Sequence, residues 1–126
     1  MNTKIKNGEE VYIMEDCIFC KIAKKEIGNL ICENEYVVAF DDLNPQAPVH
    51  TLIVPKKHIE NIEAIEKDDF NYVAEIHKTI QEVAKIKGVN ETGYRVISNC
   101  GRDAGQTVMH LHYHLLAGKE LGEKII

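Results

Sequence analysis

The chain has 126 residues, of which 44% are hydrophobic and 28% charged, and its formal net charge is −5. This size and composition fit one globular domain and argue against a fibrous or wholly disordered chain. The acidic balance and the lack of an apolar run of bilayer length exclude a general nucleic-acid binder and a membrane-spanning protein, so we expect neither nucleic acid nor membrane as a partner.

The first 13 residues contain no apolar segment of the kind found in signal peptides. Residues 1–13 are the least constrained part of the sequence, and we expect them to be a flexible leader or extension, followed by a single domain over residues 14–126. Because no secretion signal is evident, we expect a cytoplasmic protein whose four cysteines stay reduced.

Helices are expected in two places. A short helix is plausible over residues 17–25 and is broken by Gly28. The clear helix spans residues 68–87, because apolar side chains recur there at three- and four-residue spacing. These side chains are Phe70, Val73, Ile76, Ile80, Val83 and Ala84.

Strands are expected where β-branched and apolar residues cluster between turn residues. The segments are 30–32, 36–40, 51–54, 94–98 and 107–117. Since the strands do not alternate regularly with long helices, the sequence predicts an α+β domain with an antiparallel sheet.

The most informative segment contains three of the six histidines within five positions. Alternate residues of a strand project from one face, so His110, His112 and His114 should form a row with apolar residues behind it. Three adjacent imidazoles repel one another when cationic, and an anionic ligand or a metal relieves that repulsion. One ring could then bind a phosphate while another offers a neutral nitrogen as nucleophile. A chance cluster of surface histidines is the less favoured interpretation.

A Cys-x-x-Cys pair near the N-terminus, Cys17 and Cys20, is ambiguous by itself. It fits a zinc half-site, a redox pair or two core cysteines. A zinc site needs two further ligands, for which His50 and His110 are the natural candidates. These four residues would make a closed Cys₂His₂ set, which is typical of a structural zinc ion.

Three segments resemble the Hint branch of the histidine triad (HIT) family: residues 40–50, 53–59 and 101–114. The last carries the family signature His-φ-His-φ-His-φ-φ, in which φ is apolar. The likeness covers about residues 15–118. It implies a single HIT domain with an antiparallel sheet, one long helix and a short N-terminal helix, assembled as a homodimer.

The resemblance also implies roles for individual residues. His112 would be the nucleophile that attacks the α-phosphorus and forms a covalent nucleotidyl-histidine, and His114 would bind phosphate and help to protonate the leaving amine. Asp42 and Leu43 match the turn that contacts the ribose. Further nucleotide contacts are implied at Asn99, Gly105, Gln106, Thr107 and Val108.

The expected function is therefore hydrolysis of purine nucleoside 5′-phosphoramidates or other nucleotidyl adducts, with a structural zinc ion and no organic cofactor. Two alternatives stay open: a dinucleoside polyphosphate hydrolase, and a zinc-stabilised nucleotide-binding regulatory module with incidental turnover. Hint proteins often have a C-terminal Trp that shapes leaving-group preference. This chain has no Trp, so its leaving group is open.

Overall fold

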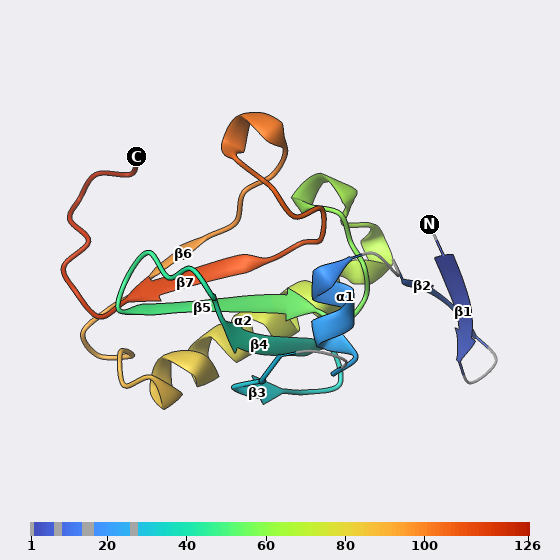
Figure 1. Ribbon diagram of the computed structural model, residues 1–126, viewed down its shortest axis with the longest axis horizontal. Helices are drawn as coiled ribbons and strands as arrows, with labels where there is room; N and C mark the ends of the chain where they lie inside the picture. The colour runs from blue at the N-terminus through green and yellow to red at the C-terminus, as the bar shows by residue number, and fades with distance from the viewer. Residues whose placement is uncertain (1, 7–8, 14–16, 26–27) are drawn as a thin grey trace.

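The computed structural model describes residues 2–6, 9–13, 17–25 and 28–126. Its main feature is a five-stranded antiparallel sheet with the strand order β3-β4-β5-β7-β6 (Figure 1). The strands are β3 (Cys32–Glu33), β4 (Val37–Asp41), β5 (Val49–Pro55), β6 (Arg95–Ile97) and β7 (Tyr113–Ala117). The α+β class and the antiparallel sheet predicted from the sequence are confirmed.

Two α-helices lie on opposite sides of this sheet in Figure 1, with α1 in front of β4 and β5 and α2 behind them. They are α1 (Ile18–Ala23) and α2 (Phe70–Ile86). Three short 3₁₀ helices are also described: η1 (Ile62–Ala64), η2 (Lys67–Asp69) and η3 (Arg102–Ala104). No helix among the described residues is long and apolar enough to cross a membrane.

The larger core lies between α2 and the sheet. Ile76 and Val83 of α2 are fully buried and pack with Val37, Ile53 and other strand residues. The predicted apolar stripe is correct over the middle and end of the helix. It fails at the start, where the Phe70 side chain is 58% exposed.

A smaller core lies between α1 and the other face of the sheet. Phe19 and Ile22 of α1 pack with Val38, Phe40 and Leu52, and the Phe19 ring meets that of Phe40 edge-on at 5.6 Å. Successive side chains of β4 point to opposite faces of the sheet, so Val37 lies in the larger core and Val38 in the smaller one.

The predicted strand over residues 107–117 forms only in its second half, because β7 begins at Tyr113. In the register that pairs Ile53 with Tyr113, Leu111 would face Pro55. A proline has no N–H for the ladder, so pairing ends there. The N–H of Leu111 instead donates to the carbonyl of Ile59 at 2.6 Å.

Residues near the N-terminus form a hairpin of two strands, β1 (Asn2–Lys6) and β2 (Glu9–Ile13), in a sheet separate from the main one. The leader predicted over residues 1–13 includes this hairpin, whereas residues 1 and 7–8 lie outside the described part. Whether these residues act as a flexible leader stays a prediction.

Candidate active site

The three histidines of the sequence motif lie close together although only His114 belongs to a strand. The Phe19 ring meets the rings of His110 and His112 edge-on, at centroid distances of 6.1 and 5.0 Å. The rings of His112 and His114 are 5.0 Å apart. His110 and His112 are buried, whereas His114 is half-buried.

The hydrogen bond of His112 determines which of its ring nitrogens is reactive. Nδ1 lies 2.7 Å from the backbone carbonyl oxygen of His110. A carbonyl only accepts, so Nδ1 carries the proton and Nε2 of the neutral ring keeps its lone pair. Burial lowers the pKa of His112, against the opposing effect of this hydrogen bond. The ring is therefore held neutral, with Nε2 as a potential nucleophile.

A second chain of hydrogen bonds fixes the tautomer of His114. The backbone N–H of Gln46 donates to Nδ1 of His50 at 3.0 Å. The proton of neutral His50 is consequently on Nε2, which lies 2.8 Å from Nδ1 of His114. His114 must accept there and carry its own proton on Nε2. Burial, then repulsion from His112 and His50, lowers the pKa of His114 to about 4.

Asp42 lies next to this chain, with one carboxylate oxygen 3.5 Å from Nε2 of His50. Its other oxygen accepts from the backbone N–H of Asn44 at 2.8 Å. Asp42, His50 and His114 are close enough to hold a metal ion. Nε2 of His50 carries a proton, however, so the group is better described as a hydrogen-bond chain.

A cavity of about 760 Å³ lies between α1 and the turn that follows β4. Its wall is mostly apolar and includes Ile18, Phe19, Ile22, Phe40 and Leu52. Of the residues expected to contact a nucleotide, Asp42, Leu43, Thr107 and Val108 line this cavity. Phe19 connects it to His112. An apolar pocket with a carboxylate at one side suits a nucleoside.

Asn99, Gly105, Gln106, His112 and His114, which are also expected to contact the nucleotide, do not line this cavity. The structure gives Gln106 a supporting role. Its buried side-chain amide donates to the carbonyls of Glu60 and Val108, at 2.8 and 3.0 Å, and accepts from the N–H of Gly101 at 2.8 Å. Its backbone N–H donates to the Gly101 carbonyl at 3.1 Å. These bonds occupy every donor of Gln106, so the residue holds the loop that contains η3.

Four potential metal ligands converge beside the buried end of the histidine row: Cys17, Cys20, His58 and His110. Their donor atoms all lie within 4.8 Å of one another. Nδ1 of His110 is 3.4 Å from each sulfur and 3.1 Å from Nδ1 of His58.

The chemistry of these donors fits a metal ion. Nε2 of His110 donates to the Pro55 carbonyl at 2.9 Å, which leaves Nδ1 with a lone pair facing the sulfurs. Hydrogen bonding by Cys20 holds the pKa of the Cys17 thiol far below its usual range despite burial. A thiolate and two neutral imidazoles are the ligand forms that zinc binds.

The prediction of His50 as the fourth ligand is wrong, because His58 occupies that place. His50 lies near the start of β5, and Pro55, whose carbonyl holds His110, lies at its end. Five residue steps along the strand place them about 17 Å apart. His58 follows the end of β5 and so reaches the cysteines. Its only sequence signal is its place in the segment 53–59 that resembles the HIT family.

Comparisons with known proteins agree with this architecture. A family model described as HIT domain matches residues 24–121. An uncharacterized HIT-like protein of Chlamydia trachomatis is 51% identical over 92 residues, which cover 73% of this chain and 82% of that protein.

Two solved structures are also similar. A HIT family hydrolase from Clostridium thermocellum is 50% identical, with a TM-score of 0.87, over 90% of this chain and all of that chain. A histidine triad nucleotide-binding protein from Candida albicans is 32% identical, with a TM-score of 0.72, over 88% of this chain and 87% of that chain. Together with the match of the family model, these likenesses show that the chain belongs to the HIT domain family.

Proposed function

We propose that this protein hydrolyses purine nucleoside 5′-phosphoramidates, or related nucleotidyl adducts, through a covalent intermediate on His112. The observation that carries the proposal is the 2.7 Å hydrogen bond from Nδ1 of His112 to the His110 carbonyl, because it leaves Nε2 free to attack phosphorus. The similar structures described as a hydrolase and as a nucleotide-binding protein support hydrolysis of a nucleotide.

The substrate would bind with its base against the apolar wall of the cavity and its ribose near Asp42. A carboxylate there can accept hydrogen bonds from both ribose hydroxyls. Thr107, which lines the same cavity, offers a hydroxyl to the phosphate. The phosphorus would then lie near the paired rings of His112 and His114.

The reaction would proceed in two steps. Nε2 of His112 bonds to phosphorus, the phosphorus–nitrogen bond breaks, and the leaving amine keeps its electron pair and takes a proton from solvent, while the N–H at Nε2 of His114 donates a hydrogen bond to it. A water oxygen then bonds to phosphorus and releases a proton to solvent, while the phosphorus–imidazole bond breaks and His112 returns to its neutral form. The products are a nucleoside monophosphate and an amine.

The decisive experiment is acid-quenched incubation with adenosine 5′-phosphoramidate labelled in the nucleotide. We expect covalent label on the wild-type protein and none on His112→Ala, with exposed His77→Ala as the matched control that keeps the label. Tight nucleotide binding without label or turnover would instead favour a regulatory module.

We also propose that the metal is zinc, held by Cys17, Cys20, His58 and His110. Bound zinc would supply a structural cross-link between these segments, since four protein ligands leave no open position for substrate. Metal analysis of protein purified without chelators should give about one zinc per chain, and the double variant Cys17→Ser/Cys20→Ser should give far less.

The protein is further proposed to be a homodimer. Strand β6 has one neighbour in the sheet, and its Val96 side chain is 38% exposed. A free strand edge with apolar side chains is suited to pairing with a second copy. Analytical ultracentrifugation should give twice the mass of the chain, and Val96→Lys should shift the species toward monomer.

A further inference from the structure

The short helix α1, together with its N-cap, supplies residues to two different sites. Cys17 at the N-cap and Cys20 provide the two sulfurs of the cysteine–histidine cluster. Ile18, Phe19 and Ile22 line the nucleotide cavity. A helix of six residues is not stable in water by itself, so its position depends on its contacts with the rest of the protein.

The sulfurs connect α1 to two segments that are distant in the sequence. Sγ of Cys20 lies 3.3 Å from Nδ1 of His58, and Sγ of Cys17 lies 3.4 Å from Nδ1 of His110. The apolar side of α1 packs on the sheet through Phe19. The helix is thus held by one small apolar core and by the cluster.

The two histidines of the cluster belong to segments that support the catalytic side of the cavity. Next to His58, the carbonyls of Ile59 and Glu60 accept from the N–H of Leu111 and from the side chain of Gln106, at 2.6 and 2.8 Å. The carbonyl of His110 accepts from His112. The cluster is therefore connected to three parts of the proposed site. They are α1, which forms one wall of the cavity, the loop that Gln106 holds, and the segment that carries His112.

We infer that Cys17 and Cys20 are positioning residues for nucleotide binding, and that metal occupancy of their cluster sets nucleotide affinity. Through an ion shared with His58 and His110, the two cysteines would hold α1 in place as the cavity wall. The inference rests on the proposed function, because it takes this cavity to be the nucleotide site.

The expected size of the effect follows from the fraction of molecules in which α1 is docked. Only those molecules present Ile18, Phe19 and Ile22 to the base. If metal removal leaves about a tenth of the molecules docked, the apparent affinity for nucleotide falls about tenfold. Residues of α2, on the other face of the sheet, should be little affected.

The test compares wild-type protein loaded with zinc and wild-type protein stripped by a chelator. Calorimetry measures the Kd for AMP, and amide hydrogen exchange measures the opening of α1 relative to α2. We expect about tenfold weaker AMP binding after stripping, with faster exchange in α1 and little change in α2. Cys20→Ser should show the same two changes in the presence of zinc.

Cys32→Ala is the matched control, because Cys32 lies in β3 and packs against the core on the opposite face. It should keep the wild-type Kd and the wild-type exchange of α1. If Cys20→Ser does not fold, the comparison of loaded and stripped wild-type protein decides the question. Equal AMP affinity and equal α1 exchange in those two samples overturn the inference and leave the proposed function intact. Loaded protein that binds no AMP overturns both.

Discussion

His50 and His114 are joined by a 2.8 Å contact between Nε2 and Nδ1, and the backbone N–H of Gln46 determines its direction. Because this N–H occupies Nδ1 of His50, His50 donates and His114 accepts. The tautomer that places a proton on Nε2 of His114 is therefore imposed by the turn between β4 and β5. His50, which lies outside the histidine motif, thus determines the tautomer of His114 inside it.

Substitution of His50 tests this control. We expect His50→Ala to lower kcat by about a hundredfold, the lower range for loss of a positioned proton donor, with a much smaller change in KM. His50→Gln keeps an N–H donor near the position of Nε2 and should recover part of the loss. Steady-state kinetics with adenosine 5′-phosphoramidate measure both constants. Equal kcat in the alanine and glutamine variants would show that donation by His50 is unimportant.

The lowered pKa of His114 predicts that acid destabilises the fold. In the unfolded chain this histidine takes a proton near pH 6.5, whereas in the folded protein its pKa is about 4. Between these values the unfolded chain binds more protons, so the free energy of unfolding falls as the pH falls through this window. Above about pH 6.5 His114 is neutral in both the folded and the unfolded chain, so its titration no longer lowers the free energy of unfolding.

Urea unfolding at pH 7.5, 6 and 5 measures this dependence. His114→Asn keeps an acceptor near the Nδ1 position and removes the titrating group, so its stability should fall less with acid than that of the wild type. His77→Asn changes an exposed histidine of α2 and should keep the wild-type dependence. A His114→Asn protein as acid-sensitive as the wild type would contradict the prediction.

The sequence is informative where a feature depends on local spacing. The alternation of His110, His112 and His114 and the period of the α2 stripe are local, and the sequence predicts both. The choice of His58 over His50 depends on where β5 begins and ends, which is a property of strand pairing across the sheet. Residue type alone does not distinguish these two histidines.

The role of Gln106 likewise depends on contacts that spacing does not reveal. Its partners include Glu60, 46 residues away in the sequence. A glutamine in a glycine-rich loop is equally compatible with contacting a ligand or with holding the loop. Its internal hydrogen bonds favour the second role, and a contact with a nucleotide stays a prediction.

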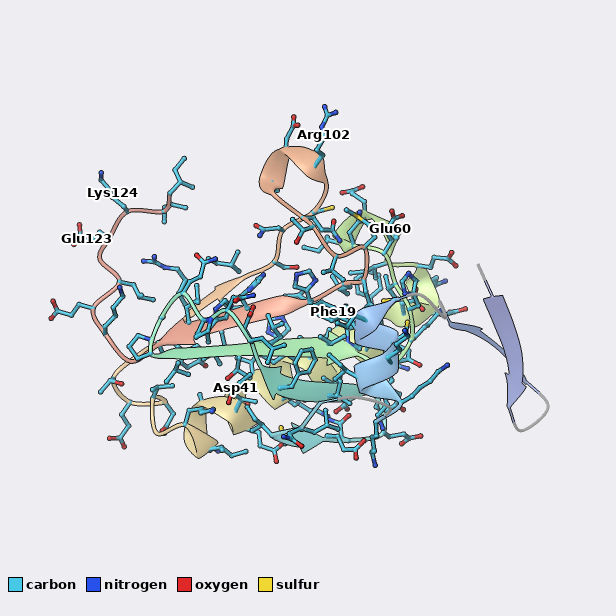
Figure 2. All side chains as sticks on the ribbon, in the orientation of Figure 1. Phe19, Asp41, Glu60, Arg102, Glu123 and Lys124 are labelled. Atoms are coloured by element: carbon cyan, nitrogen blue, oxygen red, sulfur yellow. The ribbon has the colours of Figure 1, made fainter. Side chains whose placement is uncertain are left out.

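Gln106→Glu should therefore destabilise the loop that contains η3. The substitution keeps the shape of the side chain but replaces the amide that donates to Glu60 and Val108 by a second acceptor. The carbonyls of Glu60 and Val108 then lose their donor and a carboxylate takes the buried place of the amide, which lowers the free energy of unfolding by about 1–3 kcal/mol. Urea unfolding measures the loss, and Arg102→Ala at the exposed tip of the loop is the neutral control (Figure 2). Unchanged stability of Gln106→Glu would refute the supporting role.

Gly118 is predicted to control the position of the turn that leads into β5. An added Cβ would lie 2.8 Å from Cβ of Pro48 and 3.3 Å from the backbone nitrogen of Val49, immediately before His50. The φ angle of Gly118 is +93°, which also disfavours any other residue. Gly118→Ala should lower the free energy of unfolding by about 1–3 kcal/mol more than a glycine-to-alanine substitution that has the same backbone strain but no such close contact.

Gly122→Ala supplies that comparison, because its φ is +80° and nothing lies within 4 Å of the added Cβ. Thermal and urea unfolding of the two alanine variants separate the contact with Pro48 from the backbone strain that both share. Displacement of Val49 should also disturb the hydrogen bond from His50 to His114, so Gly118→Ala should lower kcat in the same direction as His50→Ala. If the two glycine variants lose equal stability and equal activity, the approach of Gly118 to Pro48 does not constrain the turn.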